Sequence, residues 1–545
     1  MKKFLKTKII LPFLALTIFL STTAFQNDFF EIAKQIEIFT TLFKELNMNY
    51  VDETNPGDLM DTAIKSMLAD LDPYTNFYNE QDVEQAKINR TGDYIGIGAK
   101  VKTLKDKLVI VEPYKGYPAD NSGLKAGDEI IKVGDVTVAD YDDDAGNLLQ
   151  GTPGSNVEVT FIRQGKIMNA SIKHAEVEID AVPYFSMVNE TIGYIVLSKF
   201  NNKASQQTSY ALRDLKAQGA EKIILDLRGN PGGLLSEAVN VVNLFVPKGQ
   251  LVVTTKSKVK DYNKTYYTQM EPVDTEIPLV VLINGSSASA SEIVSGSLQD
   301  LDRAVIVGAR SFGKGLVQRP KPLNYGTQLK VTISRYYTPS GRCIQALDYW
   351  HRDDKGNAVR ISKEKYNEFK TKSGRPVFDG GGVLPDEQLE ISKNSAITEA
   401  ILNKDLVFDF ATKYYYSHPN INIDNFKLTD SDFSDFKDYI KSQGFSFETE
   451  TEKAFAKAFE QAEKDQIDEA IKNEYTSLLN GINSYKASAI DKDKAQLMSL
   501  LTDEIVKRYA YREGLFKYYT INNPEIQKAS EILSKSSLYR GYLRP

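Results

Sequence analysis

Two short segments of the chain carry side chains that could perform nucleophilic catalysis together. The first is a serine cluster within Asn284–Glu292, and the second is a glycine-lysine loop within Ser311–Gln318. A serine hydroxyl becomes a strong nucleophile when a general base removes its proton, and lysine can serve as that base in place of histidine. Ser289 and Lys314 are 25 positions apart, which puts a strand and a turn between the helix that the serine would open and the lysine.

A third segment, Leu225–Leu234, has the pattern of a strand that ends in a glycine turn before a helix. Glycines expose backbone N–H groups without side-chain obstruction, as an oxyanion hole requires. The serine cluster lies where a strand ends and a helix begins at Ala290, so a serine there sits at the positive end of the helix. Serines before a helix are commonly ordinary caps, so the cluster alone does not establish catalysis.

The loop Gly308–Gly315 resembles a phosphate-binding pattern, Gly-x-x-x-x-Gly-Lys followed by Ser or Thr. It departs from the pattern at the last position, because Gly315 has no hydroxyl for magnesium, and we expect no nucleotide. We also expect no metal or other cofactor, since the acidic run at residues 140–144 lacks the glycine and glutamate of an EF-hand. The net charge of −6 argues against nucleic acid as a partner.

Histidine and cysteine offer no better catalytic arrangement. His174, His351 and His418 lie outside the core motifs, and we interpret them as surface or structural residues. The single cysteine, Cys343, cannot form an internal disulfide, and it lies beside a Pro-Ser-Gly-Arg turn without a nearby histidine. We interpret it as a packed or partly exposed thiol.

An α/β core over residues 192–340 would position the three motifs. Nearly continuous apolar runs predict strands that are buried on both faces, and the segments 205–219 and 235–245 have helical periodicity. The predicted strands are Ile192–Leu197, Lys222–Leu227, Leu279–Ile283 and Ala304–Val307.

Short strands and glycine turns between residues 91 and 179 predict a compact module, which we bound at residues 88–180. Pro118-Ala119 and Gly123–Ile130 resemble the pattern of PDZ domains, and Tyr94-Ile95-Gly96-Ile97 lies where such domains carry their carboxylate-binding loop. The resemblance implies that backbone N–H groups hold a peptide's terminal carboxylate while the peptide adds a strand to a sheet edge. Alternatively, this PDZ-like module only positions other domains.

The two ends of the chain have other patterns. Residues 1–24 have the basic start, apolar run and small-residue exit of a secretory signal peptide, and the apolar run is shorter than the roughly 20 residues of a membrane span. Residues 27–85 are predicted to be a helical segment, and residues 394–545 a charge-rich helical region for assembly or support. We expect an exported, soluble protein of the periplasm, cell envelope or extracellular space.

In this order, the three motifs resemble those of the C-terminal processing (tail-specific) proteases, a family of serine peptidases with a PDZ domain. The resemblance runs from residue 30 to about residue 390 and includes Leu71-Asp72-Pro73, Tyr337–Arg342 and Gly381–Asp386. It implies a multidomain α+β protein whose α/β protease core, of the crotonase/ClpP-like type, occupies residues 181–393. The β-rich PDZ domain is inserted before it, with helical segments at both ends.

The resemblance also assigns roles to individual residues. Ser289 would be the nucleophile, Lys314 the general base and Gln318 the residue that orients the lysine. The N–H groups of Gly233 and Ala290 would bind the oxyanion. The chain departs from the family pattern just before the nucleophile, where its approach is one residue longer.

The chemistry places a demand on Lys314. To act as a base near neutral pH, its pKa must fall by about 3 pH units, which burial among apolar neighbours can supply. An acidic partner should therefore be absent, whereas Gln318 can hydrogen-bond to the lysine without adding charge. The spacing of four would bring the two together in a helix, although the segment could equally be extended.

The implied function is that of an exported serine endopeptidase. It would capture the exposed C-terminus of a protein or peptide and hydrolyse a peptide bond through an acyl-enzyme, with tail binding as a gate. A homo-oligomer through the terminal helices and an unidentified adaptor are further expectations. Two alternatives stay open: a peptide- or ligand-binding protein on the same fold, and an assembly scaffold. A pure binder would not need both Ser289 and Lys314.

Overall fold

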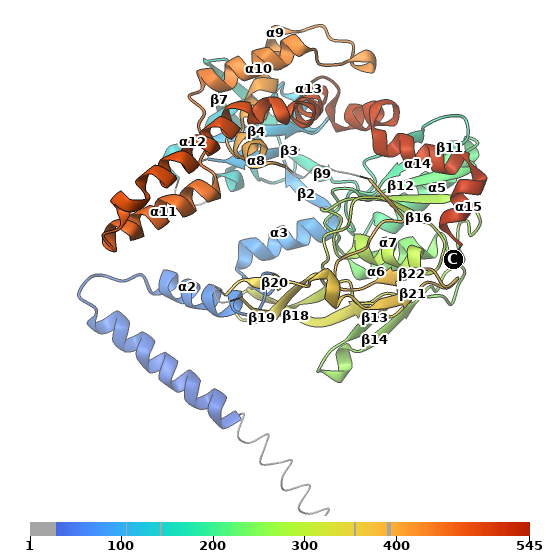
Figure 1. Cartoon of the computed structure of the whole chain (residues 1–545), viewed down its shortest axis with the longest axis horizontal. Helices are drawn as coiled ribbons and strands as arrows, with labels where there is room; N and C mark the ends of the chain where they lie inside the picture. The colour runs from blue at the N-terminus through green and yellow to red at the C-terminus, as the bar shows by residue number, and fades with distance from the viewer. Residues whose placement is uncertain (1–28, 105, 142–143, 354–355, 390–393, 545) are drawn as a thin grey trace, which may run out of the picture. The chain divides into compact units, whose positions relative to one another are not determined.

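The computed structural model describes residues 29–104, 106–141, 144–353, 356–389 and 394–544 of the 545-residue chain (Figure 1). The expected signal peptide lies outside the described residues. The chain forms two compact units: residues up to 79 with residues 320–331, and residues 80–319 with residues 332–545. Among the described residues, no helix has both the length and the apolar character needed to cross a lipid bilayer.

The smaller unit begins with helices. Residues 29–49 form the first, and α2 (Pro56–Ala69) follows. The side-chain oxygen of Asn55 accepts the N–H groups of Gly57 and Asp58, and a proline fits the first turn, where its missing N–H needs no partner. Strand β1 (Asn76–Tyr78) then pairs antiparallel with residues 328–330.

The PDZ-like module belongs to the larger unit, where α3 (Glu80–Thr91) leads into it. Its strands are β2 Asp93–Gly96, β3 Ala99–Thr103, β4 Leu108–Pro113, β5 Glu129–Val133, β6 Val136–Thr137, β7 Asn156–Arg163, β8 Lys166–Lys173 and β9 Ala175–Glu178. Its helices are the short α4 Pro118–Asn121 and two 3₁₀ helices, η1 Val138–Asp140 and η2 Ala145–Leu149. The main sheet has the order β3-β4-β5-β7-β8, and β2 pairs separately with β9. Leu108, Ile110 and Ile130 are fully buried in its core, and β4 and β5 are among the short strands predicted between residues 91 and 179.

The α/β core is built on one mostly parallel sheet with the order β10-β11-β12-β15-β16-β23. Its strands are β10 Tyr184–Met187, β11 Ile192–Val196, β12 Lys222–Asp226, β15 Leu279–Ile283, β16 Val305–Gly308 and β23 Glu387–Gln388, and its helices are α5 Ala204–Ala217, α6 Leu235–Asn243 and α7 Ala290–Asp300. The predicted strands of the core are confirmed. Because β12, β15 and β16 are neighbours and parallel, the loops that follow them meet at one edge of the sheet.

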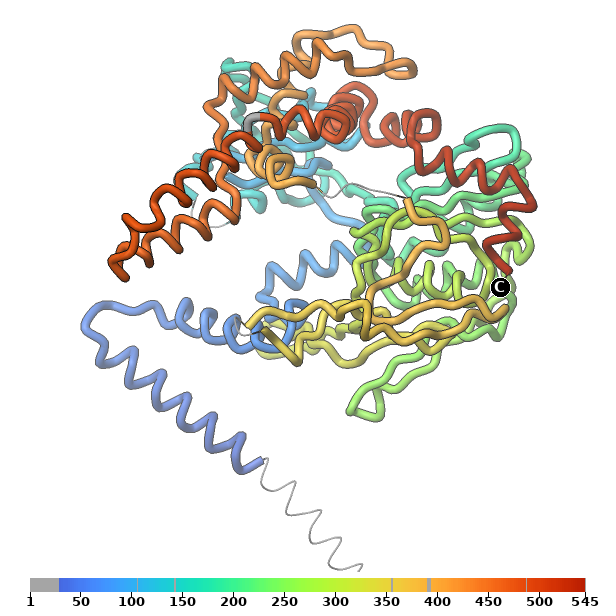
Figure 2. The backbone as a smooth tube through the Cα atoms, in the orientation of Figure 1, coloured from blue at the N-terminus to red at the C-terminus, as the bar shows by residue number. Residues whose placement is uncertain are grey.

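The apolar strands are explained by cover on both faces. Alternate side chains, such as Ile223 and Val281, pack against α5, α6 and α7. The others, such as Ile224 and Leu282, pack against α14 (Pro524–Ser534) from the C-terminal region. In Figure 2 the red end of the tube lies beside the green strands of this sheet. The end of the chain is thus part of the core, although we placed the core's boundary at residue 393.

A second sheet and several hairpins continue from the core. Strand β18 (Gln328–Tyr337) pairs with β17 (Leu316–Pro322) and, through residues 335–337, with β13 (Leu251–Lys256). The remaining short elements are η3 Lys260–Tyr262, β14 Lys264–Tyr267, β19 Leu347–Arg352, β20 Ala358–Arg360, η4 Lys363–Lys365, β21 Glu368–Lys370 and β22 Pro376–Phe378.

The C-terminal region is helical, as predicted. Its elements before α14 are α8 Ala396–Asn403, α9 Leu406–Ser417, the 3₁₀ helix η5 Ile423–Asn425, α10 Asp430–Ser442, α11 Glu450–Lys464, α12 Asp468–Lys492 and α13 Lys494–Asn522. Helix α15 (Ser536–Tyr542) follows α14. Phe410, Phe436 and Leu497 belong to a separate apolar core of these helices. Helix α13 is broken at Tyr511, whose φ of 57° is not helical.

Candidate active site

Ser289 lies at a strained turn between β15 and α7. Its φ of 54° and ψ of −110° fall outside the regions that non-glycine residues ordinarily adopt. Such a conformation costs about 1–3 kcal/mol and persists only where the surroundings enforce it. Strain of this kind is common at functional sites, and here it places a half-buried serine at the N-terminus of a buried helix.

The neighbouring serines have structural roles. The Ser287 hydroxyl donates to the carbonyl of Leu227 at 2.8 Å, and the Ser291 hydroxyl donates to the carbonyl of Asn230 at 2.9 Å. Both side chains are fully buried, whereas Ser289 is only half-buried. These two hydroxyls thus bind the glycine turn to the serine loop, and Ser289 is the serine that the strained turn presents.

The glycine turn after β12 approaches the serine loop too closely for any side chain. Asn230 shapes the turn: its amide donates to the carbonyl of Leu197 at 2.7 Å and accepts the N–H of Gly232 at 2.8 Å. A Cβ on Gly232 would lie 2.7 Å from the carbonyl oxygen of Ala288 and 2.9 Å from the nitrogen of Ala290. Glycine is therefore required at this position by contact as well as by its φ of 98°.

The N–H groups of Gly233 and Ala290, the two predicted oxyanion donors, have no hydrogen-bond acceptor among the described residues. In the parallel bridge between Phe200 and Gly233, the bonds are made by the neighbours: Phe200 donates to Gly232 at 3.0 Å, and Leu234 donates to Phe200 at 2.8 Å. Ala290 is the first residue of α7, where an N–H has no acceptor within the helix. Within the described part of the chain, no hydrogen bond uses the N–H of Gly233 or Ala290.

One buried carboxylate connects the serine segment to the lysine loop. Glu292 Oε2 accepts the backbone N–H of Ser289 at 2.8 Å and that of Lys314 at 2.9 Å. Its Oε1 accepts the N–H of Gly313 at 2.6 Å and the hydroxyl of Ser311 at 2.5 Å. Burial raises the pKa of the Glu292 carboxyl, and these hydrogen bonds oppose that rise. The backbone nitrogens of Ser289 and Lys314 are therefore close neighbours, because both donate to the same oxygen atom of Glu292.

Lys314 is half-buried in the loop between β16 and β17. The loop is packed tightly on both sides of it, since a Cβ on Gly313 would lie 2.3 Å from the Cβ of Ala346 and one on Gly315 would lie 2.9 Å from the Cβ of Gln345. The N–H groups that would face a phosphate in a nucleotide-binding loop are here bonded to Glu292. The chain then continues as a strand, whereas a phosphate-binding loop leads into a helix.

Gln318 lies in β17, so the segment after Lys314 is extended. Its amide donates to the hydroxyl of Thr332 on β18 at 3.2 Å. The structure thus decides between the two conformations that the spacing of four allowed. The orienting role of Gln318 toward Lys314 stays a prediction.

The residues predicted to bind a peptide tail border a free sheet edge. Tyr94, Ile95 and Gly96 pair with β9, and the carbonyl of Ile97 accepts the N–H of Ala119 at 2.7 Å. The next strand, β3, is last in its sheet, and within the described parts of the chain it pairs on one side only, with β4. Burial raises the pKa of the Tyr94 hydroxyl well above its usual range. A peptide could add to β3, although tail binding by these residues stays a prediction.

The three histidines lie outside these motifs, and the single cysteine is not activated. His174 is buried between the carbonyl of Leu149 and a serine hydroxyl of the PDZ-like module, and His351 is exposed beside Asp348. His418 stacks on a tyrosine of α9. Burial raises the pKa of the Cys343 thiol, which disfavours the reactive thiolate. These placements match the surface or structural roles that we expected.

Comparison with known proteins matches three segments of the chain. Residues 95–174 match the PDZ domain model, residues 191–348 the peptidase family S41 model, and residues 397–533 the model of a probable PDZ-protease C-terminal helical domain. A carboxy-terminal-processing protease of Bartonella bacilliformis is 34% identical over 321 residues, which are 58% of this chain and 73% of that protein. The chain belongs to the carboxy-terminal-processing protease family.

Other members of the family give similar values. The carboxy-terminal processing protease CtpA of Bacillus subtilis is 32% identical over 55% of this chain and 65% of that protein. The solved structure of a photosystem II D1 C-terminal processing protease is 27% identical, covers 64% of this chain and 86% of its own, and has a TM-score of 0.36. As a carboxy-terminal-processing protease, the chain is a serine-type peptidase with a PDZ domain, and it acts on peptide or protein substrates.

Two residues that contact the candidate site were not assigned a role in it from the sequence. Glu292 stands three positions after Ser289, which is the spacing of a capping box and could have pointed to it. The buried Tyr336 donates its hydroxyl to the carbonyl of Ser289 at 3.1 Å and its N–H to the carbonyl of Gly315 at 3.0 Å. No local pattern marks it, because these contacts are between residues far apart in the sequence.

Proposed function

We propose that this protease cleaves with Ser289 as nucleophile and Lys314 as general base. The observation that supports this pair most directly is the Glu292 carboxylate, which holds the backbones of both residues through one oxygen atom. The strained turn at Ser289 and the two available N–H groups beside it add the other parts of an acyl-transfer site.

The proposed reaction has two halves. The neutral Lys314 amine takes the proton of the Ser289 hydroxyl while its oxygen attacks the scissile carbonyl carbon. The N–H groups of Gly233 and Ala290 stabilise the oxyanion of the tetrahedral intermediate. The lysine then gives the proton to the leaving amine, and the C–N bond breaks to leave an acyl-enzyme. Water attacks this ester in the second half, with the lysine again as base, and the acid product leaves.

The PDZ-like module would select the substrate. We assign the tail carboxylate to the loop Tyr94-Ile95-Gly96-Ile97 and the peptide strand to the free edge of β3. Gln318 would orient Lys314 when substrate is bound. We further propose that the protein is exported by its signal peptide to the periplasm or cell envelope. We also propose that the helices at its two ends support a homo-oligomer.

The decisive experiment measures cleavage of an unstructured protein that ends in apolar residues. Ser289→Ala and Lys314→Ala are each expected to lower the turnover at least about a thousandfold. Ser286→Ala, in the exposed part of the same cluster, and the exposed Lys248→Ala are the matched controls and should cleave normally. A serine-directed phosphonate probe should label the wild type and both controls but not Ser289→Ala. Full turnover in either dyad variant would refute the assignment.

A further inference from the structure

The C-terminal region holds the start of the glycine turn through Arg228. This largely buried guanidinium donates to Asp226 at 2.6 Å and to the side-chain oxygen of Asn523 at 3.0 Å, and it forms an ion pair with Glu525. Tyr194 completes the network by donating to Asp226 at 2.7 Å. Because one guanidinium bridges β12 and the start of α14, the position of the turn depends on the C-terminal helices.

The same turn touches the nucleophile segment two residues later. The carbonyl of Asn230 accepts the N–H of Ala288 at 3.0 Å and the hydroxyl of Ser291 at 2.9 Å. A shift of Arg228 would therefore move the turn that carries Gly233 relative to the turn that carries Ser289. Oxyanion stabilisation is sensitive to such shifts, because its donors must lie about 2.7–3.1 Å from the developing charge.

Helix α13, which precedes α14, makes polar contacts with the PDZ-like module. The Tyr511 hydroxyl donates to Asp120 at 2.6 Å, and Arg512 makes a two-bond ion pair with Glu112 at 2.5 and 3.0 Å. Glu513 pairs with a lysine of the module at 3.0 Å. Three consecutive residues of α13 thus bind three different positions of the tail-binding domain.

These contacts with the module occur at the break in α13. Tyr511 has a φ of 57° and a ψ of −170° inside an otherwise helical segment, a strained conformation that persists only where contacts enforce it. Its hydrogen bond to Asp120 is such a contact. Movement of the module would release that contact, and the segment from Tyr511 to Asn523 is where the helix can respond.

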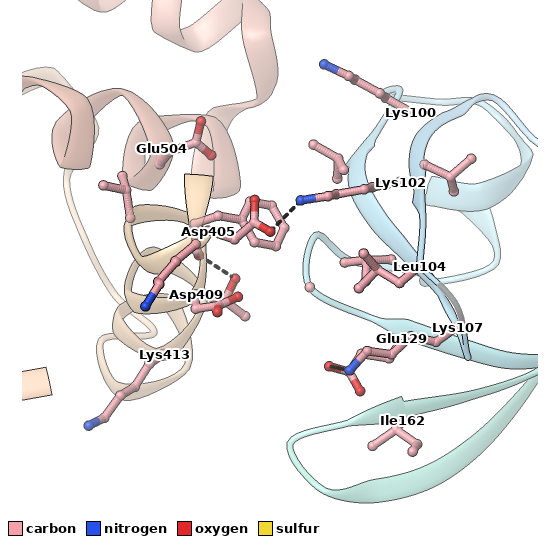
Figure 3. A pocket seen from close by; sticks show the side chains of 18 of the residues that line it. Lys100, Lys102, Leu104, Lys107, Glu129, Ile162, Asp405, Asp409, Lys413 and Glu504 are labelled. Carbon is pink, nitrogen blue, oxygen red and sulfur yellow. Dashed lines mark hydrogen bonds and ion pairs between the residues drawn. The ribbon is translucent and has the colours of Figure 1, made fainter. Parts of the chain in front are cut away.

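A second contact lies beside a cavity of about 860 Å³ between the module and α8 and α9 (Figure 3). Lys102 of β3 points across the cavity and pairs with Asp405. On the cavity wall, a Cβ on Gly127 would lie 2.5 Å from the Thr412 side chain, so module and helix are in close contact there. Because β3 is also the proposed peptide-binding edge, an added strand would form beside this junction.

We propose that residues 511–525 couple the PDZ-like module to the oxyanion turn. In this arrangement Glu525 is a positioning residue that acts through Arg228, and Arg512 reports the position of the module. The proposal rests on the proposed function, since it concerns how tail binding sets the geometry around Ser289. It gives the C-terminal helices a regulatory task in addition to completing the core.

The test uses one peptide to measure cleavage and another to occupy the PDZ-like module. A quenched peptide without an apolar C-terminus is the substrate, and a second, uncleavable peptide that ends in apolar residues is added in trans. In the wild type, the second peptide should change kcat several-fold. In Arg512→Ala the basal rate should be unchanged and this response lost. In Glu525→Gln we expect kcat to fall about tenfold with KM unchanged, and the response to be weakened.

Matched variants exclude unspecific effects. Lys494→Ala removes an ion-paired cation of α13 outside the coupling segment, and Glu531→Gln changes another carboxylate of α14; both should respond like the wild type. Binding of the trans peptide, measured by fluorescence polarisation, should be the same in all variants. The exchange Glu112→Arg with Arg512→Glu should restore the response that each single change removes.

The outcomes also separate this proposal from the proposed function. If the wild type cleaves but ignores the trans peptide, or if Arg512→Ala and Glu525→Gln both respond normally, the coupling is refuted and the dyad stands. If the wild type cleaves no faster than Ser289→Ala under every condition, the proposed function fails instead.

Discussion

The carboxylate of Glu292 accepts the backbone N–H of Ser289 at 2.8 Å, three residues ahead of it in the chain. In an ordinary helix cap this bond would only satisfy the helix N-terminus. Here the same oxygen also accepts the N–H of Lys314, so the cap ties the strained serine turn to the lysine loop. The Glu292 carboxylate bonds to the backbone N–H of Lys314. The group that must be neutral in the proposed reaction is the side-chain amine of Lys314.

Glu292→Gln should impair catalysis strongly. The amide has one acceptor oxygen in place of two, so its NH₂ group would face at least one backbone N–H donor in either orientation and leave it unsatisfied. We expect a loss of about 2–4 kcal/mol in the free energy of unfolding and a fall in kcat of about a hundredfold. Chemical denaturation and steady-state kinetics measure the two effects. The exposed Glu271→Gln should change neither, and near-normal kcat in Glu292→Gln would contradict the role of the carboxylate.

Gly232→Ala should abolish activity, whereas Gly229→Ala should be mild. Both glycines have positive φ in the same turn, but a Cβ on Gly232 meets the Ser289 segment at 2.7–2.9 Å, and a Cβ on Gly229 meets nothing within 4 Å. Gly229→Ala should lose about 1 kcal/mol of stability from backbone strain alone. Equal loss of activity in the two folded variants would show that contact with Ser289 is not the deciding factor.

Tyr336→Phe tests the support of the serine carbonyl. It removes the hydroxyl that donates to Ser289 and leaves the buried ring in place. We expect kcat to fall about tenfold with little change in KM, together with a loss of about 1 kcal/mol in stability. The control is Tyr337→Phe, a change at the half-buried neighbouring tyrosine, and this variant should have the kcat of the wild type. A rise in KM alone would point instead to a role in substrate binding.

Asp503→Asn should change how stability depends on pH. Burial raises the pKa of this carboxyl to about 6, and its hydrogen bond from Tyr519 opposes the rise. Since the pKa in the unfolded chain is about 3.9, the folded state binds more protons between about pH 4 and pH 6, and stability falls as pH rises through this window. The asparagine variant should lose this fall and be about 1–2 kcal/mol more stable at pH 7.

Denaturation profiles between pH 4 and pH 8 would measure this effect. The exposed Asp435→Asn, in the same helical region, is the control and should keep the profile of the wild type. An equally steep fall in Asp503→Asn would assign the pH dependence to another group.

Ile532→Ala tests whether the last helices belong to the core. This fully buried side chain of α14 packs against the sheet with Ile224 and Leu282, so its truncation should cost about 2–5 kcal/mol. Ile521→Ala, at a position that is 55% exposed near the end of α13, should cost much less. If thermal unfolding shows equal stability for the two variants, the C-terminal helices are not part of the cooperative core.

Much of the fold could be predicted because its signals are local. Runs such as Leu279–Ile283 are apolar at every position, which marks strands with cover on both faces, and the structure confirms them. Gln318 shows the limit of such signals. Its spacing of four from Lys314 suits a helix or a strand, and only its pairing in the second sheet made the segment extended.

The sequence by itself determined the parts of the site: a serine before a helix, a lysine in a glycine loop and a glycine turn, each after a buried strand. The tertiary structure alone decided that β12, β15 and β16 lie side by side, that Glu292 joins two of the loops, and that α14 covers the sheet behind them. Side-chain periodicity records which face of an element is buried, but it does not record the partner. The choice of partner depends on contacts between segments that lie far apart in the chain, such as the ion pair between Arg228 and Glu525.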